Sequence, residues 1–472
     1  MTQPVVYVDL DGTLSPSDVL IESCLMLLKQ QAWMVFPMLW WALRGGWYFK
    51  QQVASRVNPN LEFLPIDAQV LDRLNQLKAA GHTLVLASAS VARDVQKVAA
   101  RLGIFDRVLA SQTHNLKGRA KLQAIEADAA GRPFFYFGDA AVDLPIWKAS
   151  AHAFAVNPSR AVVLKARASG IELHEIRSRA SRLRAAAKAM RLQQWAKNAL
   201  LFLPLIAAHN RSMELWVSMF WGFVAFGLVA SATYIWNDLM DLNADRQHPR
   251  KRHRPMASGA LPVVQALPLM MALGLGGFAM SAWLVGVAFT AVLLIYTVLT
   301  LLYTFVFKRT AFVDVLLLAV LYTVRVIAGG VATGIDLSSW LLAISLFVFL
   351  SLALVKRCAE LEFLQLEGAQ PQGRGYRMSD LSYLVSMGIS SGFVAVLVLA
   401  LYVDSQNGSM LYKTPEYLWG ICPLFLYWLM RIWIMTSRKE MMDDPVHFAI
   451  HDRISWGFLL AVAVLVALAR WA

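Results

Sequence analysis

The feature that most constrains this sequence is a series of apolar runs, each about twenty residues long, that recurs from near residue 190 to the C-terminus. A run of this length with few charges is long enough to cross a bilayer as a helix. Nine spans are predicted, at roughly 195–208, 215–236, 264–281, 284–303, 312–332, 339–357, 384–402, 417–436 and 454–470. Residues 192–472 are therefore predicted to form an all-α polytopic membrane bundle.

The distribution of basic residues predicts how this bundle is oriented. They gather in the loops after the second, fourth, sixth and eighth predicted spans, whereas the other loops carry little beyond Arg211 and Lys413. Because loops rich in lysine and arginine stay in the cytoplasm, the N-terminus is predicted to lie inside and the C-terminus outside the inner (plasma) membrane. The net charge of +13 is then explained by orientation, anionic lipids and phosphate binding, without nucleic acid.

Residues 1–191 have a different composition, which is typical of a soluble domain followed by a linker. Residues 1–14 lack the basic and apolar regions of a signal peptide, so this domain is expected to stay in the cytoplasm. The three cysteines, Cys24, Cys358 and Cys422, are scattered and fit reduced thiols. Residues 177–191 are basic without any acid, which is typical of a juxtamembrane helix on an anionic leaflet.

Residues 1–176 alternate predicted strands with predicted helices. Strands are predicted at 4–10, 83–87, 134–137 and 152–156, and helices at 68–80, 91–102 and 119–129. This alternation predicts an α/β fold with a doubly wound parallel sheet. Asp9, Asp11, Ser88, Asp139 and Asp143 follow the predicted strands, at the edge where open α/β sheets bind ligands.

The polar residues at the strand ends resemble the motifs of the haloacid-dehalogenase superfamily of phosphohydrolases. Asp9-Leu10-Asp11-Gly12-Thr13 is similar to its first motif, Ser88 to its second, Lys121 to its third, and Asp139 with Asp143 to its fourth. The resemblance implies that Asp9 attacks phosphorus and that Asp11 acts as general acid and then as base. The alternative is a catalytically inactive fold in which these carboxylates cap loops.

The same resemblance implies a magnesium ion and a set of phosphate ligands. Mg²⁺ is expected between Asp9, the backbone carbonyl of Asp11 and Asp139, with Asp143 in support. Ser88 and Lys121 are expected to hold the phosphoryl oxygens, and Lys117 is the competing choice for the lysine.

The segment of about residues 18–66 is expected to be the cap of this domain. Residues 33–43 are unusually apolar and rich in tryptophan, but eleven residues are too few to cross a bilayer. A helical core explains part of this run. The other part is predicted to dip into the membrane interface, where tryptophan is favoured, so that the phosphatase reaches a lipid-borne substrate.

An aspartate-rich segment follows the second predicted span and precedes a basic run at 246–254. Read as a helix end, Asp238, Asp241 and Asp245 are spaced i, i+3 and i+7 and fall on one face. Like charges this close are costly to desolvate, so a hard divalent cation shared with substrate phosphates is expected there. The alternative is a solvated acidic loop between two membrane helices.

Asn237-Asp238-x-x-Asp241-x-x-x-Asp245 resembles the first aspartate-rich motif of the UbiA superfamily of intramembrane prenyltransferases, which are nine-helix bundles. The second such motif is reduced here, since residues 303–314 hold one carboxylate, Asp314. Residues 191–198, 248–255, 356–361, 374–376 and 444–453 resemble the decaprenyl-phosphate phosphoribosyltransferases of that superfamily. This resemblance implies transfer of phosphoribose from phosphoribosyl pyrophosphate (PRPP) to a polyprenyl phosphate.

The charged residues are then expected to bind this donor. Asn237 and the three aspartates would hold magnesium pyrophosphate, and Asp314 a second ion or the ribose. Candidates for phosphate and substrate binding are Arg191, Lys197, Lys251, Arg252, Arg254, Tyr303, Lys308, Arg325, Lys356 and Arg357. The alternative for each cation is membrane orientation. Arg325, inside a span, is expected to face a cavity or to pair with a carboxylate such as Glu360.

The sequence is also compatible with two functions other than phosphoribosyl transfer. One is an aromatic, quinone-precursor prenyltransferase that uses polyprenyl diphosphate beside an independent phosphatase. The other is an inactive membrane scaffold that tethers a phosphatase. The sequence favours a magnesium-dependent phosphoribosyltransferase whose product loses its 5-phosphate at the fused phosphatase domain.

Overall fold

The computed structural model describes residues 3–112, 115–178, 181–366, 375–405, 412–441 and 445–471. The chain forms two compact units. The first comprises Met1–Met190 together with Tyr234–Ala272, and the second Arg191–Thr233 together with Leu273–Ala472. The aspartate-rich segment therefore belongs to the same compact unit as the N-terminal domain.

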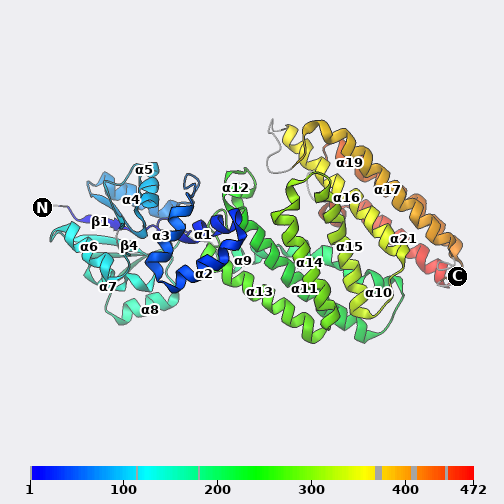
Figure 1. Cartoon of the computed structure of the whole chain (residues 1–472), viewed down its shortest axis with the longest axis horizontal. Coiled ribbons are helices and arrows are strands. Elements are labelled where there is room, and N and C mark those ends of the chain that lie inside the picture. Colours follow the sequence, from blue (N-terminus) through cyan, green and yellow to red (C-terminus); the bar gives the residue numbers. More distant parts are fainter. Residues whose placement is uncertain are drawn as a thin grey trace. The chain divides into compact units, whose positions relative to one another are not determined.

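The first unit contains a parallel sheet of six strands in the order β3-β2-β1-β4-β5-β6 (Figure 1). The strands are β1 (Val5–Val8), β2 (Leu84–Val91), β3 (Arg107–Ser111), β4 (Phe134–Gly138), β5 (His152–Val156) and β6 (Leu173–Ile176). The prediction of a doubly wound α/β domain is confirmed. The prediction of four strands was incomplete, because β3 and β6 were missed.

Helices cover both faces of the sheet, as alternation along β1 requires. Val6 and Val8 face α4 (Ala68–Ala79) and α5 (Ala92–Leu102) in one buried core. Val5 and Tyr7 face the opposite core, which includes residues of α6 (Arg119–Ala129), α7 (Leu144–Ala149) and α8 (Arg160–Ala168). The strand ends that carry the aspartates are thus fixed by two separate apolar layers.

The expected cap is helical. It consists of α1 (Val19–Gln30), η1 (Ala32–Met34), α2 (Val35–Leu43) and α3 (Gly46–Arg56), which share a small core around Leu27, Trp41 and Val53. Asp18 caps α1, since its side chain accepts a hydrogen bond from the Ile21 amide. The basic linker contains α9 (Arg182–Met190), while Arg179 lies outside the described residues.

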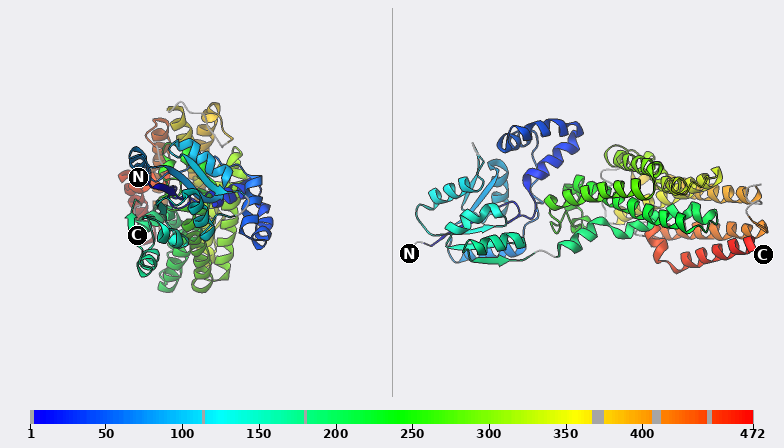
Figure 2. Two further views of the ribbon diagram at one scale, coloured as in Figure 1. Left: turned by 90° about the vertical axis from the view of Figure 1, so that its left-hand side faces the viewer. Right: turned by 90° about the horizontal axis from the view of Figure 1, so that it is seen from below.

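Eight helices in the described part of the chain are long and apolar enough to span a membrane. They are α11 (Met213–Met240), α13 (Val263–Leu284), α14 (Val287–Phe305), α15 (Val313–Thr333), α16 (Ser339–Leu366), α17 (Leu381–Asp404), α19 (Ile421–Ser437) with the 3-10 helix η7 (Pro415–Gly420) before it, and α21 (Arg453–Trp471). The long helices of the second unit lie side by side (Figure 2). This chain is a multi-pass membrane protein, as the apolar runs predict.

Close packing holds α16, α17 and α19 together. A Cβ on Gly388 would lie 2.1 Å from Cζ2 of Trp433, so only glycine fits there. The Trp433 indole N–H donates to Ser351 Oγ at 3.1 Å, and that hydroxyl donates to the Gly388 carbonyl at 2.8 Å. These polar groups are satisfied between the helices, as an apolar environment requires.

The segment expected to be the first span has a different geometry. Instead of one long α-helix, it forms the 3-10 helix η3 (Leu192–Phe202) followed by the short α10 (Leu203–Ala207). A Cβ on Gly329 would lie 2.0 Å from the Leu201 carbonyl oxygen, so this segment packs directly on the backbone of α15. Its buried Lys197 and Asn198 also separate it from an ordinary lipid-facing span.

Candidate functional sites

Asp9 follows β1, and its carboxylate lies beside a buried lysine. The Nζ atom of Lys121 is 2.8 Å from Asp9 Oδ2. Burial alone would lower the pKa of Lys121, but the carboxylates of Asp9 and Asp143 outweigh it and raise that pKa. Lys117 is exposed, so the geometry favours Lys121 as the lysine of this site.

Asp11 is held by three donors. Its Oδ1 accepts from the Val19 amide at 2.9 Å, and its Oδ2 accepts from Ser90 Oγ at 2.5 Å. Ser88 Oγ is farther from the same oxygen, at 3.5 Å. Burial raises the pKa of Asp11 to about 7 and the charge of Asp18 adds to this, while the bonds from Ser90 and Val19 oppose it. A carboxyl with this pKa can both give and take a proton near neutral pH.

Three carboxylates could hold a metal ion. Ligand oxygens of Asp9, Asp139 and Asp143 all lie within 4.8 Å of one another, and this is the one such group among the described residues. Asp143 also accepts from the Tyr136 hydroxyl at 3.0 Å and from the Asp139 amide at 3.2 Å, which fixes its position. An oxygen-only set of this kind fits Mg²⁺.

Gly12 leaves room for the Asp139 side chain. Its φ is +81°, and a Cβ there would lie 2.4 Å from Asp139 Oδ2. Thr13 approaches the same carboxylate, with Oγ1 3.4 Å from Oδ1. The first and fourth predicted motifs are therefore in contact, as the resemblance implied.

The cap adds a residue that the sequence reasoning missed. Lys50 of α3 donates to the Ala89 carbonyl at 2.7 Å and to Asn115 Oδ1 at 3.0 Å. Burial lowers the pKa of Lys50, although the charges of Asp11 and Asp18 oppose this. Ser90 was also missed, but the repeat Ser88-Ala89-Ser90 gave a signal for it, whereas nothing in the sequence marked Lys50.

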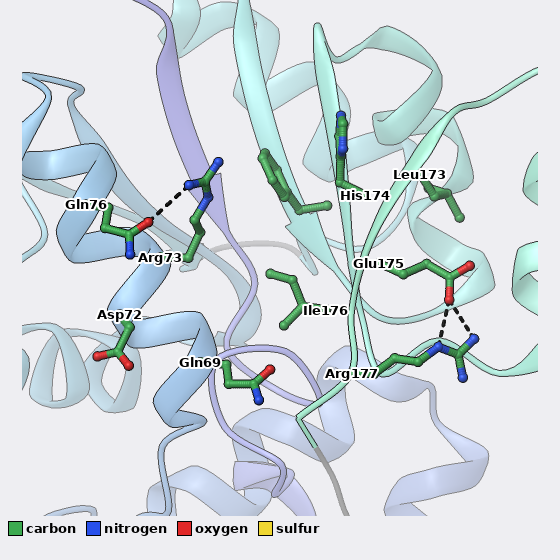
Figure 3. Close-up of a pocket in the computed structure, with 10 residues that line it drawn as sticks. Gln69, Asp72, Arg73, Gln76, Leu173, His174, Glu175, Ile176 and Arg177 are labelled. Carbon is green, nitrogen blue, oxygen red and sulfur yellow. Dashed lines mark hydrogen bonds and ion pairs between the residues drawn. The ribbon is translucent and has the colours of Figure 1, made fainter.

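A hollow in the first unit lies away from the predicted aspartates. It has a volume of about 710 Å³ and lies between α4 and the edge strand β6 (Figure 3). Arg73, His174 and Arg177 line it, and none of the predicted catalytic residues does. The phosphatase site is therefore assigned to the grouped carboxylates and lysine around Asp9 and Asp11, and not to this open hollow.

The aspartate-rich segment contains a shared ion pair. Arg254 Nη1 lies 3.0 Å from Asp238 Oδ1 and 2.6 Å from Asp245 Oδ2. Both aspartates are buried, with 2% and 3% of their surfaces exposed. Asp241 instead lies 3.2 Å from Lys29 of α1. The expectation of one helical face is corrected, because α11 ends at Met240 and α12 (Leu242–Gln247) begins after the turn at Asp241.

The second unit contains a buried ion pair at the reduced second motif. Arg357 Nη2 lies 2.6 Å from Asp314 Oδ2, and the two side chains are 1% and 0% exposed. The Tyr376 hydroxyl donates to Asp314 Oδ1 at 2.5 Å and accepts from the Phe312 amide at 2.8 Å. Arg357 also pairs with Glu360. Arg357 and Asp314, predicted separately as ligands, are thus partners.

Arg325 has partners other than the carboxylate suggested for it. Its Nε donates to Asn198 Oδ1 at 3.1 Å, and its Nη2 donates to the Tyr296 hydroxyl at 2.9 Å. Glu360 binds Arg357 instead, so the suggested Arg325–Glu360 pair is wrong. Lys197 is buried, with Nζ 5.6 Å from the centre of the Tyr322 ring. Arg325 and Lys197 are both close to η3 and α15.

The remaining predicted residues occupy ends of elements and short turns. Arg191 precedes η3 with φ +51°, Tyr303 lies on α14, and Lys356 on α16. Lys251 and Arg252 form the 3-10 helix η4 (Lys251–His253), Lys308 lies in η5 (Phe307–Arg309), and Asn237 is on the last turn of α11. Arg374 and Asp444, part of the resembling patterns, lie outside the described residues.

Comparisons with known proteins match both halves of the chain. The model of the UbiA prenyltransferase family matches residues 199–452, and that of the haloacid dehalogenase-like hydrolase matches residues 6–148. These matches confirm both family resemblances.

Relatives match either the whole chain or the larger part of it. An uncharacterized protein, y4nM of Sinorhizobium fredii, is 34% identical over 474 residues, covering 98% of this chain and 90% of that protein. Nodulation protein NoeC of Azorhizobium caulinodans is 34% identical over 59% of this chain and 90% of its own length. A decaprenyl-phosphate phosphoribosyltransferase of Mycobacterium tuberculosis is 34% identical over 57% of this chain and 88% of its own length.

Solved structures are similar at lower identity. A UbiA homolog from Archaeoglobus fulgidus bound to GPP and Mg²⁺ is 16% identical, with a TM-score of 0.46 over 60% of this chain and 99% of that chain. A protein of unknown function from Bordetella pertussis is 16% identical, with a TM-score of 0.31 over 37% of this chain and 98% of that chain.

Proposed function

Because this chain belongs to the UbiA prenyltransferase family and carries a haloacid dehalogenase-like hydrolase domain before its membrane helices, we propose that it performs two successive reactions on one polyprenyl lipid. The transferase moves 5-phosphoribose from PRPP to a polyprenyl phosphate. The phosphatase then removes the 5-phosphate, which leaves a lipid-linked ribose. Both sites act on the cytoplasmic side of the membrane, where the basic loops are predicted to lie.

The observation that carries the transferase proposal is the pair of buried carboxylates, Asp238 and Asp245, that share the guanidinium of Arg254. A substrate with a diphosphate and a second phosphate needs both hard-cation ligands and several cations. The relatives named decaprenyl-phosphate phosphoribosyltransferase support PRPP as the donor. The reduced second motif, with Asp314 already bound to Arg357, favours this donor over a polyprenyl diphosphate.

The transfer exchanges one bond at the ribose for another. An oxygen of the lipid phosphate forms a bond to ribose C1, and the bond from C1 to the pyrophosphate oxygen breaks with its electron pair. The lipid phosphate is already ionised, so it needs no strong general base. Asp238, Asp241 and Asp245, with Asn237, would hold a magnesium ion, which when bound neutralises the charge of the departing pyrophosphate.

The phosphatase reaction uses the carboxylates at the end of β1. An oxygen of Asp9 forms a bond to phosphorus, and the ester oxygen leaves with a proton from Asp11. Water, deprotonated by Asp11, then releases inorganic phosphate from Asp9. Lys121 lies where it can hold a phosphoryl oxygen, and Ser88 is assigned the same task. Asp9 and Asp139, with Asp143 behind them, would hold magnesium, which neutralises phosphoryl charge when bound.

The cap supports a lipid-borne substrate for this phosphatase. Trp33, Phe36, Leu39, Trp40 and Leu43, on η1 and α2, are 50–86% exposed. The guanidinium of Arg44 lies 3.7 Å from the centre of the Trp40 ring, at the end of the same helix. An exposed face of aromatic and aliphatic residues beside a cation is suited to the headgroup region of a bilayer. The interface contact expected from the sequence is therefore part of this proposal.

Two donor mixtures test the proposed transfer. Detergent-purified full-length protein is incubated with labelled PRPP and polyprenyl phosphate, and separately with labelled polyprenyl diphosphate and 4-hydroxybenzoate. Label that passes from PRPP into the lipid fraction supports the proposal. Prenylated 4-hydroxybenzoate in the second mixture, with no lipid label in the first, would replace it with the aromatic prenyltransferase.

A further inference from the structure

The cap helix α1 contacts the aspartate-rich segment through its last turn. Lys29 Nζ donates to the Met240 carbonyl at 2.7 Å and lies 3.2 Å from Asp241 Oδ1. Met240 is the last residue of α11, where carbonyl groups lack helical partners and the helix dipole is negative. An ammonium group at this position therefore stabilises both the helix end and the orientation of Asp241.

A second contact lies two turns earlier on α1. Glu22 and Arg246 form a two-pronged ion pair, with Nη1–Oε2 at 2.9 Å and Nη2–Oε1 at 2.6 Å. The two side chains are only 4% and 2% exposed, and Ser17 Oγ also donates to Glu22. A buried charge without its partner is strongly unfavourable, so this pair fixes α12 relative to α1.

The buried pair is adjacent in sequence to the shared ion pair of the aspartates. Arg246 follows Asp245 on α12, and Asp245 is bound with Asp238 through Arg254. Glu22 and Lys29 are seven residues apart, so they lie on one face of α1. That face contacts the aspartate-rich segment at its turn, through Asp241, and on α12, through the residue next to Asp245.

The chain after α12 also packs against the hydrolase domain. Gly259, with φ +78°, would place a Cβ only 2.2 Å from Cγ of Pro16, just before α1. No larger residue fits this contact without a shift of the backbone. The segment from Asp238 to Gly259 is therefore seated on the start and on the face of the cap.

We infer that α1 of the hydrolase cap is a positioning element of the transferase, with Glu22 and Lys29 as its positioning residues. They act through Arg246 and Asp241 and set the arrangement of the carboxylates that bind the diphosphate. This inference rests on the transferase half of the proposed function. It assigns the hydrolase domain a second role, which is independent of its own aspartates at the end of β1.

Hydrogen exchange of the peptide that contains residues 238–247 tests this role in full-length protein. The variants are Glu22→Gln and Lys29→Met, with Glu126→Gln and Lys148→Met at exposed positions of the same domain as matched controls. Without ligand, exchange in this peptide should be at least tenfold faster in Glu22→Gln than in wild type and both controls. Equal rates would overturn the inference.

A titration with magnesium pyrophosphate separates this inference from the proposed function. In wild type and controls it should slow exchange of the peptide, and in both variants the same protection should need at least tenfold more pyrophosphate. Absence of protection in wild type would count against the diphosphate role of the aspartates, while the unliganded rates would still decide the role of α1. Equal titrations in variants and controls would overturn the inference.

Two further measurements test whether the variants are folded and whether the ion pair itself is responsible for the effect. Hydrolysis of p-nitrophenyl phosphate should stay within twofold of wild type in both variants, since Asp9 and Asp11 are untouched. The reversed pair, Glu22→Arg with Arg246→Glu, should recover at least part of the slow exchange of the 238–247 peptide that Glu22→Gln loses. A reversed pair no better than Glu22→Gln, with intact hydrolysis, would contradict positioning by this ion pair.

Discussion

The ammonium group of Lys121 lies 2.8 Å from a carboxylate oxygen of Asp9, and both side chains are mostly buried. Asp9 follows β1 and Lys121 is on α6, which packs on the sheet with Tyr7 and Val5 in its core. A buried cation beside a carboxylate attracts an anionic substrate toward that carboxylate. In the proposed reaction this pair receives the phosphoryl group, so loss of the Asp9 carboxylate has a measurable consequence.

Replacing Asp9 with asparagine should abolish the phosphatase reaction. The asparagine side chain lacks the nucleophilic carboxylate and cannot form the aspartyl phosphate, so hydrolysis of p-nitrophenyl phosphate should fall by roughly a thousandfold or more. The transferase should stay active, so its lipid product should accumulate with the 5-phosphate intact, as measured by mass spectrometry. If Asp9→Asn still released the 5-phosphate from the lipid, another enzyme or site would be responsible.

Replacing Ser90 with alanine should weaken the phosphatase and change its pH profile. Ser90 Oγ donates to Asp11 at 2.5 Å, and loss of a hydrogen bond to a charged group costs about 1.5–3 kcal/mol, or roughly 10- to 100-fold in rate. This bond opposes the effect of burial, which raises the pKa of Asp11 to about 7.

Without Ser90 the pKa of Asp11 rises further, and the protonated acid persists to higher pH. The alkaline limb of kcat/KM should therefore move to higher pH, because protonated Asp11 serves the leaving group. Ser169→Ala, at an exposed helix end, is the matched control and should change neither rate nor profile. A limb that moves to lower pH would contradict the assignment of Asp11.

The strand ends were predictable, but their neighbours were not. The β-rich runs before Asp9, Ser88 and Asp139 gave the strands and the site, since parallel strands end at one edge. β3 and β6 were missed because both are short edge strands whose apolar pattern is weak. β3 has five residues and begins with Arg107, and two of the four residues of β6 are the polar His174 and Glu175.

Contacts between distant segments could not be read from the sequence. Glu22 and Arg246 are 224 residues apart, and neither stands in a recognised motif. Lys50 likewise approaches the phosphatase site from the cap, which no local periodicity reveals. The aspartate-rich segment was found by its charge, but its break at Asp241, where Lys29 of α1 forms an ion pair, has no marker in the local sequence.

Replacing Asp245 with asparagine should remove transferase activity selectively. Its carboxylate is buried and shares the guanidinium of Arg254 with Asp238. The neutral amide would leave part of the Arg254 charge uncompensated, and it would remove one proposed carboxylate ligand of magnesium. Transfer from PRPP should fall at least roughly a hundredfold. Asp72→Asn, at an exposed position, is the control. Unchanged transfer in Asp245→Asn would favour a scaffold that only tethers the phosphatase.

Replacing Arg357 with glutamine should destabilise the membrane unit. Asp314 would keep its charge in a site where it is 0% exposed, and breaking a buried pair costs about 3–5 kcal/mol. The Tm in detergent should fall clearly, whereas Arg377→Gln, at an exposed position, should leave it unchanged. Adding Asp314→Asn to Arg357→Gln should cost less than the two single changes together, because the unpaired charge is removed. Strict additivity would contradict the pair.

Replacing Phe36 and Leu39 with aspartate should impair the phosphatase only on lipid substrates. Both side chains are exposed on α2, at 71% and 62%, so the change should leave the cap core intact. Two charges would oppose burial of this helix in the headgroup region, so hydrolysis of a phospholipid-embedded phosphate ester in liposomes should fall about tenfold or more. Hydrolysis of soluble p-nitrophenyl phosphate should be unchanged. Leu164→Asp, equally exposed on α8, is the control, and equal losses in both proteins would mean that α2 has no special contact with lipid.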